Sequence, residues 1–330
     1  MVNFTEEIMR KKLVFILVLC CVSTSVFAQN EKNVLALTKL QDYYNAGKND
    51  SIHKMLSESF QQKVNAAAMH QLLSTFQKNF GKFTSFSFVE GQDKRDTFLG
   101  NFENGQQNIG IYVNEDNKIS GLLFKPVEST EPAKFDRNTT KLRLPFNGKW
   151  LTFWGGTDKR QNYHVTTRVQ QGAFDFLKLG KNNRSYQRSG TRNEDYYAFG
   201  QPLYAVCDAV VYEVITGVED NRPTIMNPSQ PLGNSVMLKT ENDEYIVYAH
   251  LENGTVAVKA GDTVKKGQYL GNCGNSGNSS EAHLHLHIQD GPNLMTAAGA
   301  SCFFEEILVN GALKQDYSPV KFDIVSQPEK

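Results

Sequence analysis

In the stretch Ala282-His-Leu-His-Leu-His-Ile288, histidine and aliphatic residues alternate strictly. Side chains two residues apart on a β-strand point to the same face of the sheet. We therefore predict a strand that buries Leu284, Leu286 and Ile288 and presents three imidazoles on its other face. Imidazole is a common protein ligand for transition metals, so this face is a candidate metal site.

Strand-like segments surround this stretch throughout the second half of the chain. From Leu144 onward, short apolar runs are separated by Gly, Asn, Asp and Pro, and no helix-length periodic stretch competes with them. We expect strands at residues 203–206, 209–215, 235–239, 245–250, 255–258 and 283–288. Residues 144–330 are predicted to form one mostly β domain.

The first part of the chain has a different hydrophobic pattern. Apolar residues recur with helical spacing over residues 31–80, and strand-like runs follow at residues 83–89, 97–102, 109–113 and 119–124. Helices followed by an antiparallel meander predict a small α+β domain over residues 29–125. Residues 126–143 are polar, contain two prolines and lack periodicity, which is typical of a linker.

The layout of residues 29–125 resembles the nuclear-transport-factor-two-like domains that precede some secreted bacterial hydrolases. The resemblance rests on the order of elements, closed by Ile119-Ser-Gly-Leu-Leu-Phe124, and on no catalytic motif. His53 and His70 have no carboxylate or cysteine pattern around them, so we interpret them as ordinary helix-surface or edge residues. Ligand binding, folding assistance and dimerisation all stay open for this domain.

Composition excludes several classes of protein. Of the 330 residues, 40% are hydrophobic and 21% charged, which supplies enough apolar material for a sizeable core and excludes a mostly disordered chain. Lys and Arg together number 35, as do Asp and Glu, so overall charge favours neither nucleic acid nor an anionic membrane as partner. The composition leaves the oligomeric state open.

The N-terminus has the three-part layout of a secretory signal peptide. Arg10, Lys11 and Lys12 precede an apolar run over residues 13–19, and small residues lead to Ala28, where we place the cleavage site. The acidic residues before Met9 make Met9 a candidate start. The apolar run is too short for a stable membrane span. We expect an exported protein, periplasmic or extracellular.

Cleavage at that site leaves an odd number of cysteines. They are Cys207, Cys273 and Cys302. Three cysteines do not make a disulfide framework, even in a compartment that favours disulfides, so we interpret them as small buried hydrophobes. One disulfide among them stays open.

Two motifs together identify the second domain. They are Tyr248-Ala-His-Leu251 and Gly274-Asn-Ser-Gly-Asn-Ser-Ser-Glu-Ala-His283, separated by a filler that ends at Gly271. These residues resemble the lysostaphin-type, LytM-like zinc metalloendopeptidases, peptidase family twenty-three, which cut peptide cross-links in bacterial peptidoglycan. The resemblance covers roughly residues 144–308. It implies an antiparallel β-sandwich with the family's duplicated hybrid motif.

The resemblance implies a role for each histidine of the motifs. The family's HxH falls on His283 and His285, so that His285 matches a zinc ligand and His283 a catalytic histidine. His250 matches the second catalytic histidine. His287 occupies a position that is more often Glu or Gln in the family, and we interpret it as a residue at the rim of the site. Glu281 is expected in the loop before the strand.

The other two zinc ligands are expected in the family's first motif, normally HxxxD. Here His164 is followed four residues later by Arg168, and the nearest suitable carboxylate is Asp175. We predict His164 and Asp175 as ligands with a longer loop between them, because ligands must converge in space and need no fixed interval. Asp158, Asp195 and Asp208 are the alternatives to Asp175.

Two histidines and one aspartate leave one position of a tetrahedral Zn²⁺ open, as in catalytic sites. We therefore expect one zinc ion per chain and an endopeptidase acting on peptidoglycan stem peptides and cross-links. Zinc-bound water would be the nucleophile, with His250 and His283 stabilising the transition state. The alternative is an inactive wall-binding or amidase-activating module, and the bond that is cut stays open.

Overall fold

The computed structural model describes residues 31–92, 94–127 and 132–328. The chain divides between residues 127 and 128 into two compact units. The predicted signal peptide, residues 1–28, lies outside the described residues. Within the described residues, no helix combines the length and the apolar character needed to cross a membrane.

The N-terminal unit begins with helices, as predicted. Residues 31–45 are helical, and α2 (Asn49–Met55), α3 (Glu58–Gln61) and α4 (Ala66–Phe80) follow. Asn65 caps α4, because its side-chain oxygen accepts a hydrogen bond from the backbone N–H of Ala68. Gly81, with φ at +69°, ends the helix in a conformation that favours glycine.

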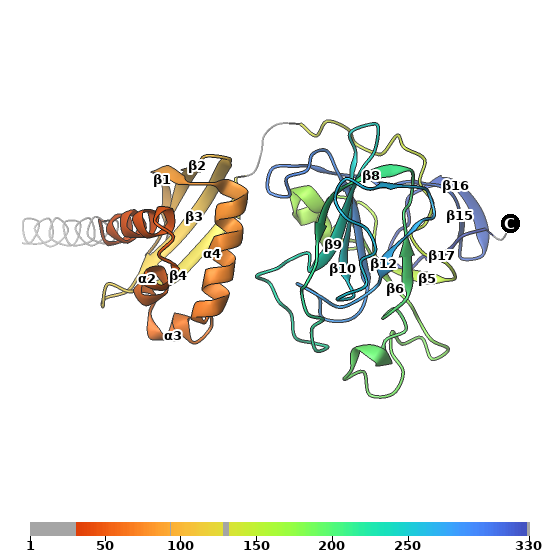
Figure 1. Cartoon of the computed structure of the whole chain (residues 1–330), viewed down its shortest axis with the longest axis horizontal. Helices are drawn as coiled ribbons and strands as arrows, with labels where there is room; N and C mark the ends of the chain where they lie inside the picture. Colours follow the sequence, from red (N-terminus) through yellow and green to blue (C-terminus); the bar gives the residue numbers. More distant parts are fainter. Residues whose placement is uncertain (1–30, 93, 128–131, 329–330) are drawn as a thin grey trace, which may run out of the picture. The chain divides into compact units, whose positions relative to one another are not determined.

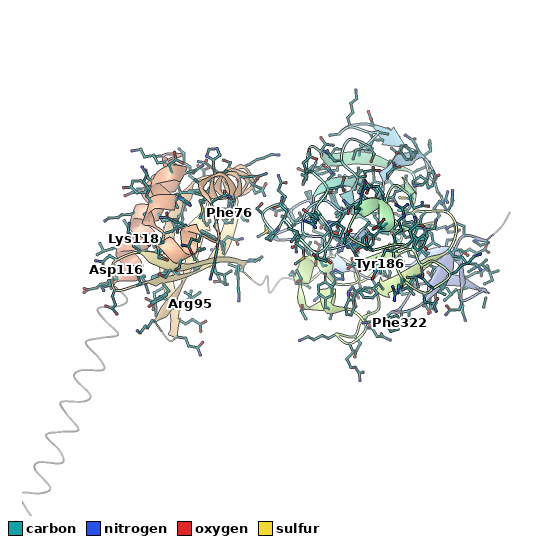
Figure 2. The ribbon with its side chains drawn as sticks, turned by 90° about the horizontal axis from the view of Figure 1, so that it is seen from below. Phe76, Arg95, Asp116, Lys118, Tyr186 and Phe322 are labelled. Atoms are coloured by element: carbon teal, nitrogen blue, oxygen red, sulfur yellow. The ribbon has the colours of Figure 1, made fainter. Side chains whose placement is uncertain are left out.

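An antiparallel sheet completes this unit. Its order is β1 (Phe83–Gln92), β2 (Arg95–Phe102), β3 (Gly105–Val113) and β4 (Ile119–Pro126). Aromatic rings join α4 to the sheet. Phe76, which is labelled in Figure 2, belongs to α4. Its ring centroid lies 5.4 Å from that of Phe102 and 4.8 Å from that of Phe124. The α+β organisation is thus confirmed. The nuclear-transport-factor-two-like resemblance stays a prediction.

The C-terminal unit is built on an antiparallel sheet of eleven strands (Figure 1). The order is β11-β8-β9-β10-β13-β6-β5-β17-β15-β16, with β14 paired to β13, while β7 and β12 form a separate pair. The bounds are β5 (Trp150–Trp154), β6 (Phe174–Leu177), β7 (Pro202–Tyr204), β8 (Ala209–Ile215), β9 (Asn234–Lys239), β10 (Tyr245–Leu251), β11 (Thr263–Val264), β12 (Tyr269–Asn272), β13 (Leu284–Gln289), β14 (Gly299–Ala300), β15 (Phe304–Val309), β16 (Ala312–Tyr317) and β17 (Ile324–Ser326).

The mostly β architecture is confirmed, and β13 is the predicted histidine-rich strand. It lies between β10 and β6 near the middle of the sheet. Leu284, Leu286 and Ile288 have no exposed surface and belong to the main hydrophobic core, as predicted. The three predicted free cysteines are buried and form no disulfide with one another.

One predicted strand is wrong. Residues 255–258 form no strand, although the short apolar run Val256-Ala-Val258 favours one. The backbone turns at Gly254, where φ is +77°, and the N–H of Thr255 bonds back to the carbonyl of Glu252. Ala257 then makes a single backbone bond to Leu270, so the segment passes β12 without forming a ladder.

The glycine-rich segment before β13 packs backbone against backbone. A Cβ at Gly277 would clash with the backbone of Gly233, and φ at Gly277 is +76°. A Cβ at Gly274 would clash with the backbone of Glu252. Glycine is therefore required at both positions by close approach, and this approach fixes where β13 begins.

Gly277→Ala should destabilise the C-terminal unit much more than Gly217→Ala. Both glycines have positive φ, so each alanine has a left-handed penalty of about 1–2 kcal/mol. Only Gly277 adds a backbone clash, because nothing lies within 4 Å of a Cβ at Gly217. We expect Gly277→Ala to lower the free energy of unfolding by about 1–3 kcal/mol more than Gly217→Ala does. Urea unfolding followed by tryptophan fluorescence reports this unit alone, since both tryptophans, Trp150 and Trp154, belong to it. Equal losses of unfolding free energy in the two variants would contradict the close approach of the Gly277 and Gly233 backbones.

Candidate metal centre

Two of the predicted ligands face each other across neighbouring strands. Asp175 on β6 and His285 on β13 are direct register partners in the antiparallel pair. Side chains of such partners stand on the same face, only a few ångströms apart. Nδ1 of His285 lies 2.9 Å from Oδ1 of Asp175. The sheet itself therefore holds the carboxylate beside the imidazole.

His164 reaches the same point from a loop. It lies in the short 3-10 helix η1 (Tyr163–Thr166), between β5 and β6, and its Nε2 is 3.6 Å from Oδ2 of Asp175. Asn162 orients this ring. The amide nitrogen of Asn162 donates to the carbonyls of Gly156 and Ala173, which leaves its oxygen on the side of His164. That oxygen accepts a hydrogen bond from Nδ1 of His164 at 2.8 Å. The lone pair of Nε2 is thereby directed at the carboxylate.

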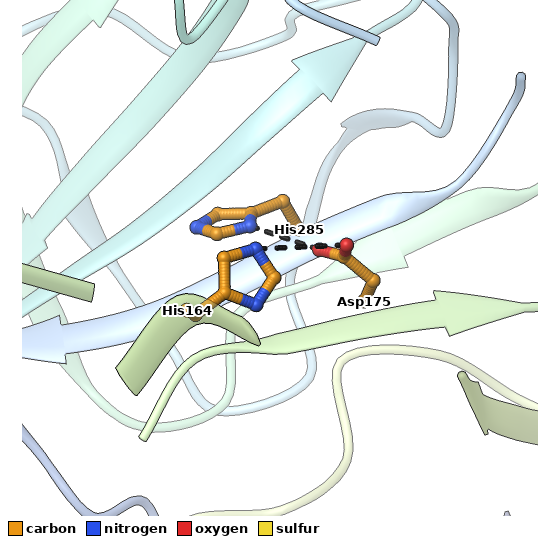
Figure 3. A group of neighbouring side chains, drawn as sticks. All are labelled: His164, Asp175 and His285. Carbon is orange, nitrogen blue, oxygen red and sulfur yellow. Dashed lines mark hydrogen bonds and ion pairs between the residues drawn. The ribbon is translucent and has the colours of Figure 1, made fainter. Parts of the chain in front are cut away.

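Within the described residues, His164, Asp175 and His285 form a group that could hold a metal ion (Figure 3). One ligand atom from each lies within 4.8 Å of the others, and all three residues are buried. Two imidazoles and one carboxylate are a donor set that suits Zn²⁺. The residues present therefore fit this metal.

The three alternative carboxylates have other partners. Asp158 is bound to Arg160, and Asp208 to Lys265 and Lys266. Asp195, which is buried in η3 (Asn193–Asp195), accepts from Ser189 and pairs with Arg188.

The two predicted catalytic histidines stand beside this group. Nδ1 of His283 donates to the carbonyl of Glu281 at 2.8 Å, and its Nε2 is 3.6 Å from Oδ1 of Asp175. Nδ1 of His250 donates to the carbonyl of Ser276 at 2.9 Å. The two rings lie 4.8 Å apart between centroids. In both rings Nε2 is left as the nitrogen that can exchange a proton.

His250 has a strained backbone. Its φ is +65°, and the register of β10 against β9 shifts between Tyr248 and Leu251. A left-handed non-glycine residue costs about 1–3 kcal/mol and marks a site where position matters more than stability. Strand periodicity alone gave no indication of this irregularity.

The predicted rim position of His287 is wrong, because this residue has no exposed surface. Its register partner on β10 is Val247, which belongs with Leu232, Met237 and Ala249 to a second, small hydrophobic cluster. Beyond His285, the histidine face of β13 is therefore flanked on β10 by apolar side chains. The alternation of residues in β13 predicts which face His287 is on, but it does not reveal that the His287 side chain is buried.

Burial favours the neutral form of four histidine rings in and beside the group: His164, His250, His285 and His287. It lowers the pKa of His164 to about 3, although nearby Asp175 acts in the opposite direction. Burial likewise lowers the pKa of His287 to about 4 and holds the pKa values of His250 and His285 well below the usual range. Neutral imidazoles are the form that binds metal ions.

A cleft of about 380 Å³ opens onto the group. Aromatic and apolar side chains line one part, among them Trp154, Tyr163 and Leu232. Asn278 and Glu281 contribute polar groups, and the carboxylate of Glu281 accepts from Ser185 at 2.6 Å. As predicted, Glu281 precedes β13. The cleft offers both apolar and hydrogen-bonding surface beside the candidate ligands.

Family comparisons divide the chain as the fold does. Residues 193–296 match the family described as Peptidase family M23, and residues 38–122 match one described as Protein of unknown function (DUF3887). The C-terminal part therefore contains a segment that matches the M23 peptidase family. The M23 match includes His250, His283 and His285 but begins after His164 and Asp175.

Solved structures with similarity to this chain include three bacterial proteins. The catalytic domain of the M23 protein EnpA from Enterococcus faecalis is 18% identical over 45% of this chain and 93% of its own, with a TM-score of 0.27. A zinc containing peptidase from Vibrio cholerae is 12% identical over 73% of this chain and 93% of its own, with a TM-score of 0.29. A lytM protein from Ruminococcus gnavus is 21% identical over 38% of this chain, with a TM-score of 0.25, and this chain covers 42% of it.

The metal-free C-terminal unit should lose stability as the pH falls from about 6.5 towards 4. An unfolded histidine binds a proton below its pKa of about 6.5, whereas folded His164 stays neutral down to about 3. The unfolded state thus binds more protons in this window, and each such histidine removes up to about 1.4 kcal/mol per pH unit.

Urea unfolding across this pH range, followed by tryptophan fluorescence after chelation, measures the effect. His164→Gln should make the pH dependence shallower by about one proton. The control His70→Gln, an exposed position in the other unit, should leave the slope unchanged. A slope in His164→Gln equal to that of the unaltered protein would contradict a buried, neutral His164.

Proposed function

We propose that this chain is a zinc-dependent endopeptidase of the M23 type that hydrolyses peptide bonds in peptidoglycan cross-links. The observation that carries the proposal is the convergence of His164, Asp175 and His285 in a buried group beside a cleft. A three-residue donor set leaves room for water or substrate at a tetrahedral metal, which distinguishes a catalytic from a structural site.

When bound there, zinc supplies a Lewis acid that makes water a usable nucleophile near neutral pH. The chain's own residues do the rest. His283 and His250 have their Nδ1 protons held by backbone carbonyls, so each offers Nε2 to the reacting groups. Either ring can accept the proton of the attacking water at Nε2, and the N–H so formed can then stabilise the oxyanion that develops on the substrate carbonyl and pass the proton to the leaving amine.

The cleft accounts for substrate binding in this proposal. Its aromatic part can pack against the apolar portions of a stem peptide, and Asn278 can hydrogen-bond the peptide backbone. Whether the bond cut lies in a D-alanyl cross-link to a diamino acid or in a glycine bridge is decided by assaying both types of substrate.

We also propose the domain organisation and location that go with this activity. Residues 1–28 act as a signal peptide for export to the periplasm or the cell exterior. Residues 29–125 form the accessory α+β domain, residues 126–143 the linker, and residues 144–330 the peptidase domain. The charge balance of the chain supports no nucleic-acid partner.

Metal content and activity together test the proposal. Elemental analysis should find about one zinc per chain in the unaltered protein and none in Asp175→Ala or His285→Ala, because two ligands bind zinc far more weakly than three. Asp158→Ala is the matched control: its carboxylate is paired with Arg160, and zinc should be retained.

The catalytic histidines should separate from the ligands in the same assay. His250→Ala and His283→Ala should keep zinc yet cut cross-linked muropeptides about 10²–10⁴-fold more slowly. An unaltered protein that takes up no zinc even from excess metal would overturn the proposal. Zinc uptake without cleavage of either type of cross-link would instead leave a wall-binding or amidase-activating module.

A further inference from the structure

A line of hydrogen-bonded side chains runs along β13 behind His285. Nε2 of His285 lies 3.0 Å from Nδ1 of His287, and Nε2 of His287 lies 2.8 Å from Oε1 of Gln289. The amide nitrogen of Gln289 donates to the carbonyl oxygen of Gly291 at 2.6 Å. The three side chains are alternate residues of one strand and are at most 3% exposed, so water does not replace these links.

The far end of the line determines its direction. The carbonyl of Gly291 can only accept, so Gln289 must turn its NH₂ group towards it and its oxygen towards His287. That oxygen also only accepts, so Nε2 of His287 carries a proton. A neutral imidazole has one N–H, which leaves Nδ1 of His287 as an acceptor. The proton between the two rings therefore belongs to Nε2 of His285.

From this we infer that His287 is a positioning residue, which with Gln289 and the Gly291 carbonyl holds the proton of His285 on Nε2. Nδ1 of His285 is then left with its lone pair directed at Asp175. A backbone carbonyl thus sets the tautomer of a proposed metal ligand through two intervening side chains.

The consequence appears on the other side of the His285 ring. Nδ1 lies 2.9 Å from Oδ1 of Asp175, and with the ring proton on Nε2 both atoms are acceptors. Two acceptors at this distance repel each other unless a positive charge lies close to both. A divalent cation attracts both atoms, so the line along β13 prepares this pair for a metal ion.

The two proposed imidazole ligands carry their ring protons on different nitrogens. Asn162 holds the proton of His164 on Nδ1, whereas His287 holds that of His285 on Nε2. Each lone pair that remains faces the same carboxylate of Asp175. The inference rests on the proposed zinc role of His285 and extends it to residues that touch neither metal nor substrate.

The tautomer can be measured in the unaltered protein. Long-range proton–nitrogen NMR spectra of the full chain, labelled with nitrogen-15 in histidine, distinguish a proton on Nε2 from one on Nδ1. The His285 signals are assigned by their absence from His285→Asn. At mildly alkaline pH we expect the His285 proton on Nε2, both without metal and with Zn²⁺ added. A metal-free His285 with its proton on Nδ1 alone would overturn the inference.

Zinc affinity of His287 variants gives the second test. In His287→Leu, His285 loses the acceptor for its Nε2–H, and Zn²⁺ affinity measured by chelator competition should fall about 10–100-fold. His287→Gln is the matched control, because its amide can accept from His285 and donate to Gln289. It should bind Zn²⁺ within about threefold of the unaltered protein, since the orienting contact is retained.

The outcomes separate this inference from the proposed function. A folded His287→Leu with unchanged zinc affinity, or a His287→Gln as weak as His287→Leu, overturns the inference even if cross-links are cut. An Nε2 proton on His285 with the expected affinity ranking supports it even if no muropeptide is cleaved. The NMR experiment decides the matter if His287→Leu does not fold.

Discussion

The pairing of Asp175 with His285 across two antiparallel strands is the constraint on which the candidate centre depends. It places a carboxylate and an imidazole on one face of the sheet with no help from a loop. The other groups then join from outside: His164 from η1 and His283 from the residue just before β13. A shift of one residue in this register would turn Asp175 to the opposite face of the sheet, away from His164 and His285.

The buried polar groups around this pair show how the structure offsets their desolvation. Each histidine of the centre has one ring nitrogen bonded to an acceptor: Asn162, Ser276, Glu281 or His287. A buried imidazole without such a partner would cost about 1–3 kcal/mol. The strained backbone of His250 is a further cost in the same small region. The structure is therefore less stable at the place where the chemistry is proposed. The main hydrophobic core, to which the buried face of β13 belongs, offsets this loss of stability.

Local pattern was sufficient to predict β13, its buried face and the neighbouring strands β8, β9 and β10, because alternation and turn residues act over a few positions. It did not predict the other strands of the sheet, among them β6, which carries Asp175. It failed for residues 255–258, where backbone hydrogen bonds and not side chains decide the path. It also failed for His287, whose buried position beside Val247 depends on a neighbouring strand that is distant in the sequence. The convergence of Asp175 with His164 was predicted from a family resemblance, and residue spacing alone would not have selected it.

The loop between β5 and β6 carries a lesson for relatives of this chain. His164 and Asp175 are eleven positions apart in the sequence, yet their side chains meet because η1 folds back onto the start of β6. The interval between these two proposed ligands is thus a property of the loop, whose length can change while the sheet keeps its register. A search by the fixed HxxxD spacing would miss this candidate pair, whereas the register partner of His285 on β6 identifies the carboxylate directly.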